Sequence, residues 1–187
     1  MRSGGVVVLP TDTLYGLSAN VFLLPALERI FAIKRRPAEF SLPLLVSCWD
    51  QLEIVAGQIP EVAHQLAKRF WPGPLTLVLP KNPQLPDRVS GGKDTVAVRV
   101  PDHPVALDII RRLNGPITGT SANRSGQRDL LDYDAVTAEL GEDVDYIVRS
   151  GPQPKGASST VVDLSAEFPK LLRQGALPMD QILREIG

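Results

Sequence analysis

An apolar run passes directly into polar residues in the stretch VVVLPTDTLYGL, residues 6–17. The branched apolar residues predict a short strand over Val6–Pro10. Small hydroxyls, a carboxylate, a phenol and a glycine follow, and α/β folds place ligand contacts at such strand ends. The alternative is a turn capped by Asp12 and Thr13. The stretch therefore favours an α/β domain with a candidate site at the end of its first strand.

Short strand patterns alternate with helical patterns along the rest of the chain. Further strands are predicted at 42–47, 75–80, 96–100, 117–118, 146–148 and 160–164. Apolar spacings of three and four predict helices from Pro25 onward and at 61–70, 105–113, 134–140 and 179–186. Such a mixture predicts one α/β (α+β) domain over residues 1–187, built on one twisted mixed sheet flanked by helices.

The composition is that of a globular protein, with 43% apolar and 22% charged residues in a chain of 187. These values exclude a mainly disordered chain. The formal net charge of -1 means that any contact with nucleic acid must come from a local basic patch. One cysteine excludes an internal disulfide, and two histidines argue against a histidine-rich metal site. No stretch reaches the ~18 apolar residues that cross a bilayer, so a cytoplasmic protein without membrane association is predicted.

Three common site motifs fail on their residues. The Gly-Gly-Lys at 91–93 has Asp87 where a phosphate loop needs its first glycine. No G-x-G-x-x-G follows a strand, which removes the support for a dinucleotide fold. A serine-hydrolase elbow around Ser121 ends in Asn123 instead of a small residue, and the last histidine, His103, precedes the serine.

Three cations precede a proline in the segment KRRP, residues 34–37. Cations at the end of a helix interact favourably with its dipole, and this alone would explain them. Pro37 disfavours helix at Arg36, however, and residues two apart share a side in an extended chain. Lys34 and Arg36 are therefore predicted to converge on one phosphate or carboxylate.

Other donors point to the same kind of ligand. The loop GTSANRSG, residues 119–126, offers amide and hydroxyl donors for phosphate oxygens, although a helix N-cap uses the same residue types. Arg99 and Arg173 lie in or beside apolar strands, where a buried arginine requires an anionic ligand or an internal carboxylate. Together these groups predict a site for a small, multiply anionic ligand. Its chemistry would rest on positioning and charge neutralisation, as in nucleotidyl transfer.

The same segments carry a family resemblance. Seven motifs occur in order: PTDT with YGL (10–17), K-x-R-P (34–37), P-G-P-x-T (72–76), R-x-P (99–101), S-A-N-x-S-G (121–126), S-T-V-V-D (159–163) and L-R-x-G (172–175). In this order they resemble the YrdC family of threonylcarbamoyl-AMP synthases in its short, single-domain form. The resemblance implies a twisted mixed sheet around a deep, positively lined cavity.

The resemblance also implies an activity and its partners. ATP, L-threonine and bicarbonate would give threonylcarbamoyl-AMP, pyrophosphate and water, for the threonylcarbamoyladenosine modification of tRNA. Mg²⁺ would accompany ATP, held mainly by its phosphates and not by a protein metal site. The partners would be the protein components of the tRNA threonylcarbamoyl-transfer machinery, with weak binding of RNA (tRNA) as an additional expectation.

Roles for single residues follow from the resemblance alone. The predicted catalytic residues match those that hold the ATP phosphates: Lys34, Arg36, Ser121 and Asn123. Further ATP contacts are matched by Thr95 and Arg173, together with Ser121. The threonine-binding positions are matched by Thr13, Arg99, the backbone near Gly119, and Ser159.

Some residues depart from the family pattern. Phe40 and Ser41 stand where members often have Lys or Asn and then Pro, and Leu45 stands where some have histidine. One nucleotide or threonine contact is therefore expected to differ. Two alternatives stay open: a related carbamoyl-adenylate enzyme, normally part of a much longer chain, and an RNA-binding module that uses the basic clusters at 34–36, 68–69 and 111–112.

Overall fold

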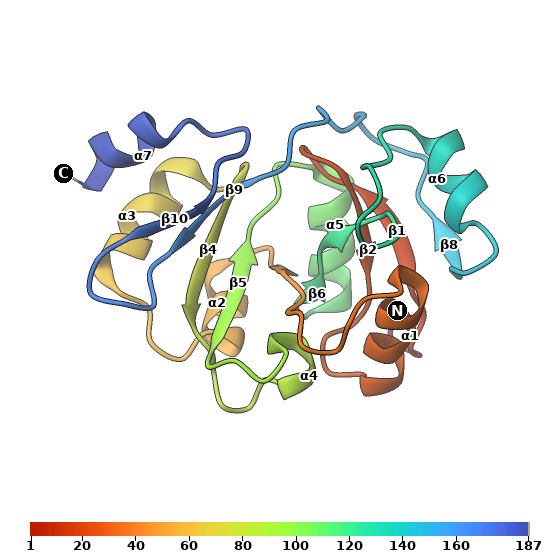
Figure 1. Cartoon of the computed structure of the whole chain (residues 1–187), viewed down its shortest axis with the longest axis horizontal. Helices are drawn as coiled ribbons and strands as arrows, with labels where there is room; N and C mark the ends of the chain where they lie inside the picture. The colour runs from red at the N-terminus through yellow and green to blue at the C-terminus, as the bar shows by residue number, and fades with distance from the viewer. Residues whose placement is uncertain (187) are drawn as a thin grey trace.

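The computed structural model describes residues 1–186, in which the strands divide between two mixed sheets (Figure 1). The four-stranded sheet, in the order β7-β2-β1-β8, contains Val7–Pro10 (β1), Tyr15–Ser18 (β2), Thr120–Ser121 (β7) and Tyr146–Ile147 (β8). The six-stranded sheet, in the order β10-β9-β4-β5-β3-β6, contains Leu44–Leu45 (β3), Leu75–Pro80 (β4), Thr95–Arg99 (β5), Ile117–Thr118 (β6), Thr160–Asp163 (β9) and Lys170–Arg173 (β10). Both sheets combine parallel and antiparallel pairs.

The two sheets meet where the chain runs from β6 through Gly119 into β7. A Cβ atom at Gly119 would lie 2.4 Å from Leu45 Cγ, so this close approach requires glycine. Across the junction, the backbone N–H of Thr118 donates to the carbonyl oxygen of Ala19 at 3.0 Å. The predicted α/β class is confirmed, but the strands form two sheets instead of one. Gly119 allows the chain to leave one sheet after two residues and enter the other.

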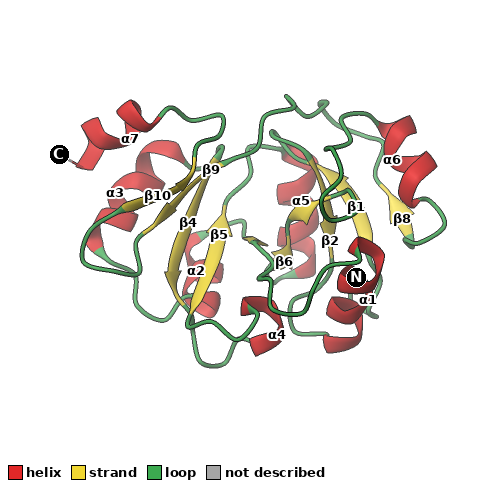
Figure 2. Ribbon diagram, in the orientation of Figure 1, coloured by secondary structure: helices red, strands yellow, loops and turns green. Residues whose placement is uncertain are grey.

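Helices lie around the outside of the sheets (Figure 2). In the described part of the chain they are Leu24–Lys34 (α1), Trp49–Val55 (α2), Glu61–Phe70 (α3), Asp87–Ser90 (α4), Pro104–Leu113 (α5), Tyr133–Leu140 (α6) and Met179–Ile186 (α7). The short helices α2 and α4 were not predicted, whereas the other helices were. Within residues 1–186, no helix combines the length and the apolar character needed to cross a membrane.

The C-terminal end of α1 determines where two predicted site residues lie. Arg35 follows the helix with φ 49°, in the left-handed region. Its backbone N–H donates to the Ala32 carbonyl oxygen at 3.1 Å, and that of Arg36 donates to the Phe31 carbonyl oxygen at 2.9 Å. This capping pattern ends the helix directly after Lys34. The chain reverses its direction at Arg35, so Lys34 and Arg36 lie on either side of this turn.

One hydrophobic core is shared by both sheets. Its buried members include Val8 and Leu17 from the four-stranded sheet and Leu44, Leu77 and Val98 from the six-stranded sheet. Side chains packed at the density of protein interiors hold neighbouring elements in fixed relative positions. The core therefore fixes the strand ends of the two sheets relative to each other.

Candidate functional site

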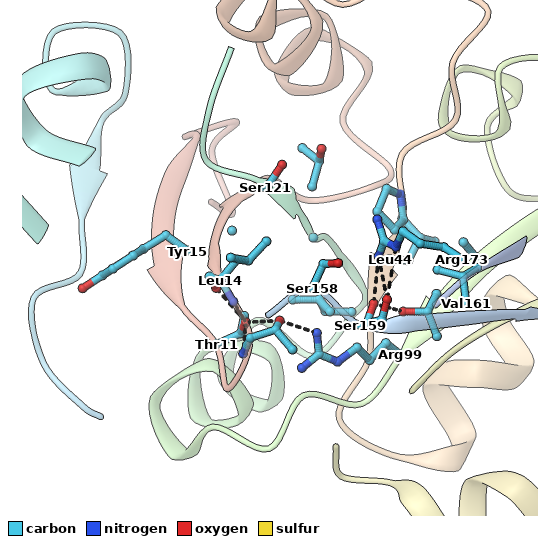
Figure 3. A pocket seen from close by; sticks show the side chains of 18 of the residues that line it. Thr11, Leu14, Tyr15, Leu44, Arg99, Ser121, Ser158, Ser159, Val161 and Arg173 are labelled. Carbon is cyan, nitrogen blue, oxygen red and sulfur yellow. Dashed lines mark hydrogen bonds between the residues drawn. The ribbon is translucent and has the colours of Figure 1, made fainter. Parts of the chain in front are cut away.

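A cavity of about 350 Å³ opens between the two sheets (Figure 3). Residues of β2, β3, β4, β5, β7, β9 and β10 line it, together with loop residues between these strands. Three arginines face it, Arg36, Arg99 and Arg173, whereas Asp129 is the one carboxylate of the described lining. The positively lined cavity predicted from the sequence is therefore present.

Arg99, at the end of β5, is held in the cavity wall by hydrogen bonds to two other segments, residues 12–13 and residue 73. Its Nε donates to the carbonyl oxygen of Gly73 at 2.8 Å and its Nη1 to Thr13 Oγ1 at 2.6 Å. Its Nη2 donates to the carboxylate of Asp12. The guanidinium is buried, as the sequence predicted, and of the two predicted kinds of partner the protein supplies the internal carboxylate. Thr13 also lines the cavity, so two of the predicted threonine-binding side chains, Thr13 and Arg99, lie in direct contact.

Ser159, directly before β9, and Arg173, the last residue of β10, form a second group (Figure 3). Nη2 of Arg173 donates to the Ser159 carbonyl oxygen at 2.9 Å and to its Oγ at 3.2 Å, and Thr76 Oγ1 lies 2.7 Å from the same Oγ. A Cβ atom at Gly175 would lie 2.3 Å from the Ser158 carbonyl oxygen, so glycine is required for this approach of the two segments. The motifs L-R-x-G and S-T-V-V-D thus meet at one wall of the cavity.

Lys34 ties α1 to the loop that follows β7. Its Nζ donates to the carbonyl oxygens of Ser121 at 2.6 Å and Asn123 at 2.7 Å, and to Asn123 Oδ1 at 3.1 Å. These three acceptors match the three protons of an ammonium group. Burial, together with the charge of Arg36, lowers the pKa of Lys34 from its ordinary 10.5 to about 8, with Asp129 opposing. Lys34 therefore shapes the loop and lies outside the cavity lining.

Arg36 faces the cavity and retains unused donor capacity. Nη2 donates to the Ser41 carbonyl oxygen at 3.1 Å, and the Phe40 ring centroid lies 4.9 Å from the guanidinium carbon. Nε is buried and has no hydrogen-bond partner among residues 1–186, and burial lowers the pKa of Arg36. A buried, unpaired donor at a cavity is a candidate contact for an anionic ligand. The predicted convergence of Lys34 and Arg36 on one anion is not present in the structure, because only Arg36 faces the cavity.

Most of the predicted site residues line this cavity: Thr13, Arg36, Arg99, Gly119, Ser121, Ser159 and Arg173. Asn123 lies behind the lining, where its Oδ1 accepts a hydrogen bond from Ser121 Oγ at 2.6 Å. Thr95 begins β5, two and four residues before Ala97 and Arg99, which places it on the same face of the strand but outside the lining.

Among the lining residues without a role predicted from the sequence, Thr76 and Asp129 carry polar side chains that bond to predicted site residues. Thr76 belongs to the quoted P-G-P-x-T motif, so its position was signalled but its contact with Ser159 was not. Asp129 lies in an exposed loop without a recognisable pattern. Oδ1 of Asp129 lies 3.5 Å from Nδ2 of Asn123, so Asp129 belongs to the hydrogen-bond network of the loop after β7.

The described cavity lining contains few side chains that could coordinate a metal ion without help from a substrate. In the described part of the chain no group of three His, Cys, Asp or Glu side chains could hold a metal. A single carboxylate beside several arginines fits a Mg²⁺ ion that a substrate's phosphates bring with them, not a cage of protein ligands.

Comparisons with known proteins cover the whole chain. A family model described as "Sua5_yciO_yrdC: Telomere recombination" matches residues 1–175. A curated Pyrococcus abyssi protein named threonylcarbamoyl-AMP synthase is 45% identical over 187 residues, and a Bacillus subtilis protein of the same name is 42% identical over 188. All of the present chain is covered in both cases, but 55% and 54% of the two relatives. The chain thus spans about half the length of these relatives.

A solved structure is similar to the same extent. The crystal structure of P. abyssi Sua5 complexed with L-threonine has 45% sequence identity and a TM-score of 0.96. The match covers 100% of the present chain and 55% of that one. Every segment that lines the cavity therefore has its counterpart within the matched half of that protein.

Proposed function

Because the chain belongs to the Sua5/YciO/YrdC family, we propose that it forms threonylcarbamoyl-AMP from ATP, L-threonine and bicarbonate. The names of the curated relatives support this activity, as does the L-threonine bound to a Sua5 relative. The structural observation that carries the proposal is the cavity between the sheets, with three arginines and several hydroxyls but one described carboxylate. Such a lining selects multiply anionic substrates.

The reaction requires that the negative charges of the substrates are neutralised and that water is excluded from the reacting groups. The amine nitrogen of threonine loses a proton and bonds to the carbon of CO₂, which bicarbonate supplies with release of water. An oxygen of the resulting carbamate then attacks the α-phosphorus of ATP. The bond from that phosphorus to the bridging oxygen breaks, and pyrophosphate leaves. Neither step needs a nucleophile from the protein, but both need two anions held close together.

The side chains of the cavity can perform this task. Arg36 has a buried Nε with no partner among the described residues, and we propose that it binds the triphosphate together with Ser121. Thr13, Arg99 and Ser159 line the same cavity and are proposed to bind threonine. Lys34 is proposed to act mainly on the shape of the loop that carries Ser121, since its protons already meet protein oxygens.

Mg²⁺ is proposed as the counter-ion of ATP. Bound to the phosphates of ATP, Mg²⁺ would neutralise their negative charge. Asp129 is the one carboxylate that the described lining offers it. Mg²⁺ keeps most of its coordination for water and phosphate oxygens when protein carboxylates are few, which agrees with this donor set.

The product is a reactive mixed anhydride, and a partner must take it up quickly. We propose that the protein components of the tRNA threonylcarbamoyl-transfer machinery do so, in the cytoplasm, where tRNA is modified. Direct RNA contact would use the basic residues outside the cavity.

The central experiment measures pyrophosphate. The full chain is incubated with ATP, Mg²⁺, bicarbonate and L-threonine, and each component is omitted in turn. Release that requires L-threonine and bicarbonate is expected, with strong loss in Ser121→Ala and unchanged release in Ser165→Ala, whose hydroxyl bonds Asp163 outside the cavity lining. Release without threonine, or no release at all, would exclude the proposed activity.

A further inference from the structure

Asp12 lies behind the cavity wall and does not line it. Its neighbours Thr11 and Thr13 line the cavity, and so does Arg99, with which the Asp12 carboxylate forms an ion pair. The side chains of Asp12 and Arg99 are only 6% and 7% exposed. In the described chain, no other ion pair has both side chains buried to this extent. A buried pair of this kind costs desolvation energy, which makes its location beside a cavity informative.

The guanidinium of Arg99 has five N–H groups, and three of them bond to protein acceptors. Gly73 and Thr13 accept from Nε and Nη1 through neutral oxygens, whereas Asp12 accepts from Nη2 through a charged one. One N–H on Nη1 and one on Nη2 remain for a ligand. The three acceptors lie on two segments, Gly73 on one and the neighbouring residues Asp12 and Thr13 on the other. Together they determine the plane of the guanidinium and thus the direction of the remaining two N–H groups.

Asp12 also joins three segments of the site. Its Oδ1 accepts from the backbone N–H of Asp102 at 3.0 Å, just after β5. Its carbonyl oxygen accepts from the backbone N–H of Lys155 at 3.3 Å, and that of Thr13 accepts from Gly156 at 2.9 Å. Residue 12 therefore connects the end of β1, the turn after Arg99, and the loop that leads to Ser158 and Ser159.

The charges around Arg99 define what Asp12 contributes. Burial lowers the pKa of Arg99, Asp12 raises it by its charge and its hydrogen bond, Arg173 lowers it, and Asp102 raises it. Asp12 is thus the main group that stabilises the charge of this buried guanidinium. A charged guanidinium binds a carboxylate through short, strong hydrogen bonds, provided that its N–H groups are aimed correctly.

We propose that Asp12 is a positioning residue for the amino-acid substrate. It holds the Arg99 guanidinium so that the two remaining N–H groups meet the substrate carboxylate, and it touches no substrate itself. The inference rests on the proposed function, since it assumes that L-threonine binds beside Arg99. Asp12 would therefore affect L-threonine and leave ATP largely untouched, because Arg36 and Ser121 lie on other segments.

The test substitutes Asp12→Asn in the full chain, which retains an oxygen acceptor but removes the charge. Calorimetry should show affinity for L-threonine weakened about tenfold, as expected when a charge-assisted bond becomes neutral, and affinity for ATP unchanged within about twofold. The matched control is Asp145→Asn. Asp145 likewise accepts from an arginine, Arg29, at 2.7 Å and from a backbone N–H, that of Val6, at 2.6 Å, but outside the cavity lining. The control should bind both ligands as the wild type does.

A double-mutant cycle shows whether Asp12 acts through Arg99. In an Arg99→Lys background, Asp12→Asn should cause no further loss of L-threonine affinity. Equal losses for L-threonine and ATP, or additive losses in the cycle, would overturn the positioning role. If Asp12→Asn does not fold, Asp12→Glu keeps the charge on a longer side chain and should show the same selective loss, while equal loss for both ligands would again overturn the role.

The outcomes separate this inference from the proposed function. A wild-type protein that binds no L-threonine would overturn both. A wild-type protein that binds L-threonine, with an Asp12→Asn variant that binds it equally well, would overturn the role of Asp12 alone.

Discussion

Nζ of Lys34 lies 2.6 Å from the carbonyl oxygen of Ser121, which follows 87 residues later in the chain. With its two further contacts to Asn123, this lysine connects the end of α1 to the loop after β7. Ser121 lines the cavity and Lys34 does not. The position of a lining residue thus depends on a buried cation from a distant helix.

Lys34→Met should destabilise the protein, because it removes these bonds and leaves buried carbonyl oxygens without donors. The expected loss in the free energy of unfolding is about 2 kcal/mol, measured by urea denaturation. Lys68→Met, on the exposed side of α3, is the control and should stay within about 0.5 kcal/mol of the wild type. Threonine-dependent turnover should fall in Lys34→Met only. Equal stability of the two variants would show that the contacts of Lys34 do not hold the loop.

Stability should depend on pH through the same residue. The pKa of Lys34 is lowered from 10.5 to about 8 in the folded protein. Between pH 8 and pH 10.5, Lys34 therefore keeps its proton in the unfolded chain but has lost it in the folded protein. The unfolded state then binds more protons, so this residue makes the free energy of unfolding rise with pH in that window, by about 1.4 kcal/mol per pH unit. Below pH 8 the cost of the buried charge is present in full.

The comparison that isolates this effect uses wild type and Lys34→Met at pH 7 and pH 9.5. Urea denaturation should show the wild type gaining stability relative to the variant at the higher pH. A difference that is the same at both pH values would mean that Lys34 keeps its proton in the folded protein.

Arg36→Lys should weaken ATP binding while the protein stays folded. Lysine keeps the charge but has no counterpart of the unpaired Nε and cannot bind phosphate in the planar, bidentate manner of arginine. KM for ATP should rise about tenfold in the pyrophosphate assay, since one well-oriented hydrogen bond to the triphosphate is lost. Arg35→Lys, at the exposed neighbouring residue, is the control. An unchanged KM in Arg36→Lys would place the triphosphate elsewhere.

Gly119→Ala should disturb the junction of the two sheets. The new Cβ atom would lie 2.4 Å from Leu45 Cγ, a side chain that lines the cavity. Thermal or urea denaturation should show a loss of about 1–3 kcal/mol, as for other overpacked sites. Gly115→Ala meets nothing within 4 Å and is the control. In combination with Leu45→Ala the cost of Gly119→Ala should shrink, because the clashing atoms are gone.

The elements with strong local patterns were predictable from the sequence. Glu61–Phe70, Leu75–Pro80 and Met179–Ile186 occur with the predicted bounds, since their apolar spacing or their β-branched runs leave one solution. The strands β2, β7 and β10 were missed. β7 has only two residues and β10 is largely exposed, so both owe their conformation to pairing partners and not to their own residues.

The site was predictable where charged or hydroxyl-bearing residues interrupt apolar strands. Arg99 and Arg173 were found in this way, whereas Ser159 followed from the family resemblance, and all three line the cavity. Lys34 illustrates the limit, because its acceptors come from a loop 87 and 89 residues away, which no local pattern reveals. Asp129 was missed for the same reason. The roles of single residues, the Mg²⁺ ion and the extent of the domain over 1–187 stay predictions.

The cavity joins segments that lie far apart in the sequence, since Thr11 and Arg173 both line it. Arg173 reaches it only after β10 has paired with β9, and β9 with β4, whose residues lie some 85 positions earlier. Contacts of such sequence separation form late, because much of the chain must close on itself first. On the ribosome, the site would be complete only when the chain has emerged through Arg173. Under the proposed function, chains that end before Arg173 would therefore spend no ATP on a reactive product, and substrates would stabilise only chains that have folded through this residue.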